Sequence, residues 1–389
     1  MQGRAPVSGP RTIYEQWMEK EGIPNYQAEA GVEDVTKLPR GPWARLGGLG
    51  TFIELEGTKQ ARKLLYVAEI PAGGALEPEK HLYDELICVL QGRGLAEVWH
   101  EGQGKVAFEW GKGSLFAIPL NAWHRFVNGS REPVLLFAVT SAPLVMNTLR
   151  NLEFIFNCDY KFTDRFTGKA DYFVVGEKQY KDWSGHNERD TNFVPDLLSV
   201  SMRPQPEKAE DQVSDGFNMA SWRGTAAGEW PAGKYHKAHY HGPGAILLGL
   251  RSEGYAILWP RQFGIHPYQD GHGDKVITVN WKVHGIYSPQ TEWFHQHFNI
   301  GTEPARHLRV TGGGIGIELP TLSKEVPTTL RDGVPVATYA SIRDGGRVIE
   351  YEDEDPAIRR GFEEILRQKG LKSAMKPVVY RTDPFREPR

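Results

Sequence analysis

Two pairs of histidines stand out in the second half of the chain. His239 and His241 are two positions apart, and so are His295 and His297 in the run WFHQHFN. Residues i and i+2 of a β-strand point to the same face, so each pair offers two imidazoles to one side of its strand. Imidazole nitrogens are good ligands for Fe, Mn, Zn, Ni or Cu. The spacing predicts a metal site made by His239, His241 and His295, although interior histidines bonded to carbonyls would show the same pattern.

The role of His297 stays open at this stage. It shares its face with His295 and is either an alternative ligand, a partner behind the ligands or a proton shuttle. Nearby residues are candidates for substrate contact. Arg251, Arg306 and Arg309 could each hold a carboxylate through two parallel hydrogen bonds, and Trp293 could line an aromatic-substrate pocket. Solvated arginines and core aromatic residues are the competing interpretation.

An earlier segment carries a second group of possible ligands. Glu79, His81 and Glu85 follow one another closely, and His124 comes from a later segment. Two carboxylates and two imidazoles could hold Fe, Mn or Zn. Buried carboxylates without a metal or a hydrogen-bonded partner would be costly. The group is therefore either a second metal site or a buried, metal-free cluster of glutamates and histidines.

The two groups occupy corresponding places in an internal repeat. At an offset of 160 residues Glu79 and His81 align with His239 and His241, and at an offset of 171 His124 aligns with His295. Further pairs follow the same offsets within one residue: Gly73 and Gly233, Gly94 and Gly254, Trp99 and Trp259, Pro119 and Pro289, Asn128 and Asn299. One domain has been duplicated within the chain.

The repeated pattern resembles the cupin superfamily. Its two motifs read G-x5-H-x-H-x3,4-E-x6-G and G-x5-P-x-G-x2-H-x3-N. The first copy matches with Gly73-x5-Glu79-x-His81-x3-Glu85-x6-Gly92 and Gly113-x5-Pro119-x-Asn121-x2-His124-x3-Asn128. Glu79 replaces the first histidine and Asn121 replaces a glycine. The second copy keeps Gly233, His239, His241, Pro289, His295 and Asn299, with Ala245 at the glutamate position and one extra residue before His295.

The resemblance implies a bicupin, in which metal lies between the HxH strand and the late histidine strand. Three histidines without a glutamate are similar to the sites of gentisate-type and β-diketone-cleaving dioxygenases, which use Fe(II). The resemblance thus implies a dioxygenase that acts on a small aromatic or enolisable carboxylate together with dioxygen. Mn, Zn or Ni remain alternative metals. Alternative functions are an oxygen-independent isomerase, lyase or decarboxylase, and a non-enzymatic ligand-binding or storage protein.

The elements that must position these residues are mainly strands. Short apolar runs such as KLLYVAEI and VLLFAVT, separated by PAGG, QGRG and NGSREP, predict an all-β protein with two jelly-roll barrels in tandem. We expect a helical N-terminal arm over 1–45, barrels over 46–142 and 217–318, and a connection over 143–216. A C-terminal extension over 319–389 should contain a helix at 356–369, with Asp355 as N-cap and Gly370 as the stop.

Composition restricts the other function classes. Lys and Arg total 46 against 49 Asp and Glu, and this balance argues against a nucleic-acid or membrane-surface binder. No run approaches the length of a membrane helix, and the N-terminus lacks the apolar core of a signal peptide. Two cysteines exclude a disulfide framework, so a cytoplasmic setting is expected. Homo-oligomers are common among bicupins, and the N-terminal arm is a candidate contact.

Overall fold

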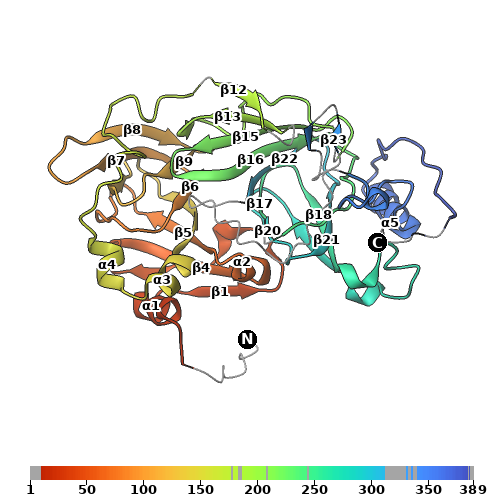
Figure 1. Cartoon of the computed structure of the whole chain (residues 1–389), viewed down its shortest axis with the longest axis horizontal. Helices are drawn as coiled ribbons and strands as arrows, with labels where there is room; N and C mark the ends of the chain where they lie inside the picture. The colour runs from red at the N-terminus through yellow and green to blue at the C-terminus, as the bar shows by residue number, and fades with distance from the viewer. Residues whose placement is uncertain are drawn as a thin grey trace.

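The fold was analysed in a computed structural model of the chain. The structure describes residues 10–176, 178–182, 186–206, 209–242, 245–311, 330–331, 334–335, 340–383 and 385. Two β-barrels stand side by side, and helix α5 lies at the far end of the second barrel from the first (Figure 1). The all-β architecture with two tandem barrels, predicted from the sequence, is confirmed.

The first barrel consists of a large and a small sheet. The large sheet has the order β1-β4-β5-β11-β6-β9-β14, with β3 paired to β4, and the small sheet has the order β10-β7-β8. Their strands are β1 (Asn25–Ala28), β3 (Gly41–Trp43), β4 (Gly48–Leu55), β5 (Leu64–Ile70), β6 (Glu85–Gln91), β7 (Arg93–Trp99), β8 (Val106–Gly111), β9 (Leu115–Ile118), β10 (Trp123–Val127), β11 (Val134–Thr140) and β14 (Phe193–Val194).

The second barrel repeats this arrangement. Its large sheet has the order β12-β13-β15-β16-β22-β17-β20-β2, and its small sheet has the order β19-β18-β21. The strands are β2 (Gly31–Val32), β12 (Gln179–Lys181), β13 (Asn187–Asp190), β15 (Val213–Met219), β16 (Trp222–Trp230), β17 (Ile246–Arg251), β18 (Gly254–Pro260), β19 (Ile277–Trp281), β20 (Ile286–Tyr287), β21 (Trp293–Asn299) and β22 (Ala305–Val310). A separate hairpin joins β23 (Leu330–Arg331) to β24 (Val334–Pro335).

The barrels exchange edge strands. β2 comes from the N-terminal arm, yet it pairs with β20 of the second barrel. β14 comes from the segment between the barrels, yet it pairs with β9 of the first. These short strands lie next to equivalent strands of the repeat, because β9 and β20 occupy the same place in their sheets. Each barrel is therefore completed by a segment that the sequence analysis assigned to an arm or a connection. The expected boundary at 318 lies outside the described residues.

The long apolar strands are explained by burial on both faces. Along β5, Leu64, Tyr66 and Ala68 pack inside the first barrel. Leu65 and Val67 point the other way, into a core shared with Trp222 and Leu308 of the second barrel and their neighbours. The face between the barrels is thus a hydrophobic core in its own right, and it keeps the two barrels in one unit.

The helices cap the ends of this arrangement. They are α1 (Ile13–Glu21), α2 (Glu56–Gln60), α3 (Ala142–Leu149), α4 (Leu152–Asn157) and α5 (Pro356–Gln368), with 3-10 turns at Val35–Lys37, Arg261–Phe263, Gly273–Lys275 and Ile342–Asp344. α1 begins with a capping box between Thr12 and Glu15 and ends at Gly22, with φ at 69°. Asp355 caps α5 by accepting a hydrogen bond from the Ala357 N–H at 2.9 Å.

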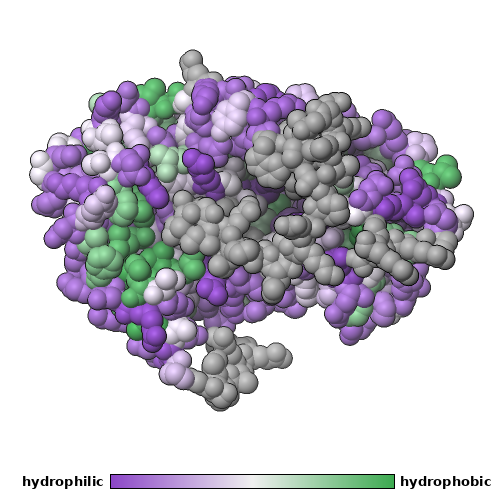
Figure 2. Space-filling view, viewed as in Figure 1, coloured by the Kyte–Doolittle hydropathy of each residue, from purple (hydrophilic) through white to green (hydrophobic). Residues whose placement is uncertain are grey.

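The surface is mostly polar on the face shown in Figure 2. An apolar area lies over the region of α3 and α4, where Leu149 and Phe154 are 42% and 50% exposed. Within the described part of the chain, every helix is too short or too polar to traverse a lipid bilayer.

Candidate metal centres

Strand β21 and the segment before β17 bring the histidines of the second barrel together. The backbones of His239 and His295 bond reciprocally, with N···O distances of 3.1 and 2.9 Å. The C-terminal extension supports the other edge of this segment. Ile349 N–H donates to the Ala238 carbonyl at 2.8 Å, and Val348 forms a bridge with His239. The histidine segment is therefore held between β21 and a strand-like piece of the extension.

Three imidazoles form a compact group in this barrel. The ligand atoms of His239, His295 and His297 all lie within 4.8 Å of one another. His241 stands beside them: its ring centroid is 4.6 Å from that of His295 and 5.8 Å from that of His239. All four are buried or nearly so. The predicted histidines thus lie close together, and the compact group of ligand atoms includes His297.

Backbone carbonyls set the tautomers of three of these rings. Nδ1 of His239 lies 3.1 Å from the carbonyl of Lys237. Nδ1 of His241 lies 3.0 Å from the carbonyl of Gly242, and Nδ1 of His295 lies 3.1 Å from that of Trp293. A carbonyl only accepts, so each Nδ1 carries the proton. In the neutral ring Nε2 then has a lone pair, which is the form that binds a metal. Neutral imidazoles of this kind suit a divalent metal ion, and ligand atoms of His239 and His295 lie close enough together to share one.

His297 has a different partner. Its Nδ1 lies 2.9 Å from the hydroxyl of Tyr287, and the same hydroxyl lies 3.2 Å from Nδ1 of His307. Burial raises the pKa of Tyr287 well above its usual range and lowers the pKa of His307 to about 3. Tyr287 therefore keeps its proton, and His307 stays neutral. Because a hydroxyl donates one hydrogen bond and accepts others, the state of His297 is linked to that of His307.

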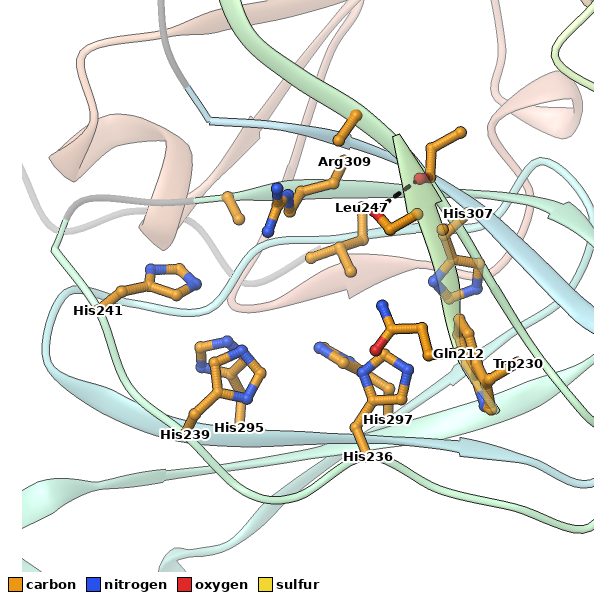
Figure 3. A pocket seen from close by; sticks show the side chains of 15 residues that line it. Gln212, Trp230, His236, His239, His241, Leu247, His295, His297, His307 and Arg309 are labelled. Atoms are coloured by element: carbon orange, nitrogen blue, oxygen red, sulfur yellow. Dashed lines mark hydrogen bonds between the residues drawn. The ribbon is translucent and has the colours of Figure 1, made fainter. Parts of the chain in front are cut away.

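A pocket opens in front of the histidines. The space between its walls and mouth is about 500 Å³, a figure that includes open solvent. Ala245, at the position where the cupin pattern has glutamate, lines it, so this position supplies no carboxylate. Figure 3 shows His241, His239 and His295 on one side of the space and His307 and Trp230 at its far end, with Arg309 pointing in from β22.

The structure separates the three candidate arginines. Arg251 and Arg306 both pair with Glu229, at 3.1 and 2.7 Å, and donate to the backbone of residues 197–200. Arg309 lines the pocket. Trp293 is half-buried, is not among the lining residues described, and contributes its carbonyl to His295. Only Arg309, among these four predicted contacts, faces the histidines.

The group of the first barrel is also assembled. Donor atoms of Glu79, His81 and His124 lie within 4.8 Å of one another. Oε2 of Glu85 is 3.5 Å from Nε2 of His81 and 3.5 Å from Nε2 of His124. These three atoms are buried without a hydrogen-bond partner in the described structure. Nδ1 of each ring faces a carbonyl, of Tyr83 and of Ala122, so Nε2 is directed at the group. Polar atoms left unpaired in this way fit a bound metal ion.

Charge is unevenly distributed in this first group. Burial opposes ionisation of Glu85, but His81 and His124 outweigh it and lower the pKa of Glu85 to about 2. Burial likewise opposes protonation of His81, yet its glutamate neighbours raise its pKa. Burial and the charge of His81 lower the pKa of His124. Without a metal, the group is an ion pair of Glu85 with His81.

The N-terminal arm closes the first group. Arg45 forms ion pairs with Glu79 and, at 2.9 Å, with Glu21 of α1. Tyr83 stacks on His81 with ring centroids 3.7 Å apart.

Asn121, which replaces the motif glycine, has a φ of 55°. Its side-chain NH₂ group donates to the carbonyls of Cys158 and Tyr160 at 2.9 and 2.7 Å. The Asn121 side chain thus holds the segment that follows α4 in place through two hydrogen bonds.

Comparison with known proteins agrees with this architecture. A family model described as a cupin domain matches residues 66–140, which extend from β5 to the end of β11. The matched residues make up most of the first barrel. The second barrel repeats the strand order of the first and carries the second copy of the motif, which agrees with the duplicated cupin barrel predicted from the sequence. No curated protein matches the chain in sequence.

Solved bicupin structures resemble the chain only distantly. Oxalate decarboxylase of Bacillus subtilis, a protein with Mn(II) centres, is 12% identical, with a TM-score of 0.46 over 80% of this chain and 86% of that chain. The coconut allergen cocosin is 11% identical, with a TM-score of 0.47 over 74% of this chain and 86% of that chain. At this level neither the metal nor the role of those proteins transfers to this chain.

Several residues of the centres were not predicted. Tyr287 and His307 lie outside both cupin motifs, and Arg45 comes from the arm. Val348 and its neighbours belong to the C-terminal extension. For His307 the sequence did offer a signal, because this histidine follows the second motif closely in the chain. The others depend on contacts between segments far apart in the chain, which spacing does not report.

Proposed function

We propose that this bicupin binds a divalent metal ion in its second barrel and acts as a dioxygenase on a small aromatic or enolisable carboxylate. The metal we propose is Fe(II), and the same imidazole donors would also accept Mn, Zn or Ni. The observation that carries the proposal is the set of Nδ1–carbonyl hydrogen bonds of His239, His241 and His295. Each bond leaves the Nε2 lone pair of its ring for a metal, and all three residues line one pocket.

The residues around the proposed metal would have different roles. His239, His241 and His295 would hold the ion, which supplies a Lewis acid and a template for substrate and dioxygen. All three ligands are neutral, so they would leave the charge of the ion available to an anionic substrate. His297, tied to Tyr287 through Nδ1, would hold or move a proton at Nε2. Trp230 and Leu247 line the pocket and would exclude water.

The compact group of His239, His295 and His297 supports a different ligand set, in which His297 replaces His241. The two sets separate by single substitutions. Loss of metal in His241→Ala but not in His297→Ala supports the first set, and the reverse result supports the second. The reaction belongs to the second barrel under either set, because its histidines face a pocket while the first group is covered by Arg45 and Tyr83.

The test is metal content of anaerobically purified protein, measured by mass spectrometry, together with oxygen uptake on catechol-, gentisate- and diketone-like substrates. A His239→Ala/His241→Ala variant should lose about one metal ion per chain and all oxygen uptake. The matched control is His81→Ala/His124→Ala, which removes the corresponding residues of the first barrel and should keep the oxygen uptake.

Three results would overturn the proposal. Full metal content and activity in the His239→Ala/His241→Ala variant would move the centre elsewhere. Turnover at an unchanged rate without oxygen would indicate isomerase, lyase or decarboxylase chemistry. Absence of metal in every preparation, even after reconstitution with iron, would favour ligand binding or storage.

A further inference from the structure

We propose that Arg309 is the carboxylate-binding residue of the second-barrel pocket, and that the substrate presents a separate oxygen donor to the histidines. This inference rests on the proposed function for the role of the histidines. It adds that the substrate carries two different binding groups, one at each end. One end is an anion bound by protein alone, and the other is the part that would meet the metal.

Strand geometry directs Arg309 into the pocket. Side chains alternate along β22, so His307 and Arg309 share one face and Leu308 and Val310 share the other. Leu308 and Val310 lie in the core between the barrels. His307 and Arg309 line the pocket, and Figure 3 shows the guanidinium reaching into the space that His241 faces. The orientation of Arg309 is therefore imposed by burial of its two neighbours.

The neighbours of Arg309 within the sheet leave its charge uncompensated. In register, it lies between Ala226 of β16 and Leu247 of β17, which are apolar and line the same pocket. Among the residues that the structure describes, no carboxylate forms an ion pair with its guanidinium, whereas Arg251 and Arg306 share Glu229. Such a charge facing a pocket favours an anion from solution.

Glu188 is an acidic residue that interacts electrostatically with Arg309. Burial raises the pKa of Glu188 to about 7, although Arg309 acts in the opposite direction. Its carboxyl group also accepts a hydrogen bond from Asn218 at 3.1 Å. Near neutral pH this carboxyl is therefore only partly ionised, and Glu188 forms no ion pair with Arg309 among the described residues.

The guanidinium suits a planar carboxylate. It can donate two parallel hydrogen bonds to the two oxygens, and this geometry distinguishes a carboxylate from a neutral amide of the same shape. The histidines lie across the pocket from Arg309 (Figure 3). A ligand that spans the pocket therefore needs a carboxylate at one end and a phenolic, enolic or keto oxygen at the other.

The test compares 4-hydroxybenzoate, whose carboxylate and phenol lie at opposite ends of the ring, with 4-hydroxybenzamide, in which a neutral carboxamide replaces the carboxylate. Binding to the full-length, metal-free protein is measured by isothermal titration calorimetry. We expect wild-type protein to prefer 4-hydroxybenzoate by tenfold or more, and Arg309→Gln to lose that preference while its affinity for 4-hydroxybenzamide is unchanged. Arg309→Lys should retain part of the preference. Arg93→Gln, at an exposed position of β7, is the matched control and should behave as wild type.

The outcomes separate this inference from the proposed function. A preference for 4-hydroxybenzoate that persists in Arg309→Gln, or its absence in wild-type protein, would overturn the role of Arg309. Metal content and oxygen uptake report on the proposed function alone, and Arg309→Gln should retain wild-type metal content. An Arg309-dependent preference in a protein that never binds metal would leave the anion site standing and overturn the dioxygenase.

Discussion

Glu354 provides a test of how the C-terminal extension supports the histidine strand. Its carboxyl group accepts hydrogen bonds from the Tyr235 hydroxyl and from Nε2 of Gln296, the latter at 3.1 Å. Gln296 lies on β21 between two of the candidate ligands. Burial raises the pKa of Glu354 to about 7 despite both hydrogen bonds, from an ordinary value of 4.5. The folded protein therefore binds a proton here that the unfolded chain releases.

The sign and size of the effect follow from this difference. Between pH 4.5 and about 7 the folded state holds more protons than the unfolded state, so stability falls as pH rises through this window. A difference of about 2.5 pKa units corresponds to about 3 kcal/mol. His307 acts in the opposite direction, because its pKa is lowered to about 3 and its neutral form gains stability as pH rises. Wild-type stability alone would mix the two contributions.

The substitution Glu354→Gln isolates the contribution of Glu354 to the pH dependence of stability. A glutamine stays neutral and can still accept from Tyr235, and its NH₂ group can donate to Oε1 of Gln296 after that amide turns over. We expect the stability of the variant relative to wild type to increase by about 2–3 kcal/mol between pH 5 and pH 8.

The assay is urea unfolding of chelator-treated protein from pH 5 to pH 8, since bound metal would add its own pH dependence. Glu109→Gln changes an exposed carboxylate of β8 and serves as the control. A constant stability difference between Glu354→Gln and wild type across this range would refute the reasoning. It would mean that Glu354 ionises in the folded protein as readily as in the unfolded chain.

Two further substitutions test hydrogen bonds at the centres. Tyr287→Phe removes the hydroxyl shared by His297 and His307, so we expect a loss of about 1–3 kcal/mol in stability, measured by urea unfolding, and unchanged stability would contradict its positioning role. Metal binding, measured by equilibrium dialysis, should stay as in wild type if His239, His241 and His295 hold the ion, and should weaken roughly tenfold if His297 is a ligand. Asn121→Gly keeps the left-handed backbone but loses two hydrogen bonds, and should cost about 1–3 kcal/mol. Asn121→Ala should cost about 1 kcal/mol more because of the positive φ, and urea midpoints in any other order would argue against the account.

Much of the second centre could be predicted from the sequence. Two histidines at i and i+2 share a face in any strand, and the duplicated motif placed His239 beside His295. Local hydrogen bonds of these rings to nearby carbonyls followed once the strands formed. The helices α1 and α5 were equally predictable, because Thr12, Gly22 and Asp355 act on residues next to them in the chain.

Pairings between distant segments were decided only by the tertiary structure. Nothing in the spacing of Arg251, Arg306 and Arg309 showed that Glu229 neutralises the first two. The exchange of β2 and β14 between the barrels, and the bridge from Val348 to His239, likewise join residues far apart in sequence. Strand periodicity gives the face on which a side chain lies. Which partner meets that face depends on how the sheets close and pack, and that is a property of the whole chain.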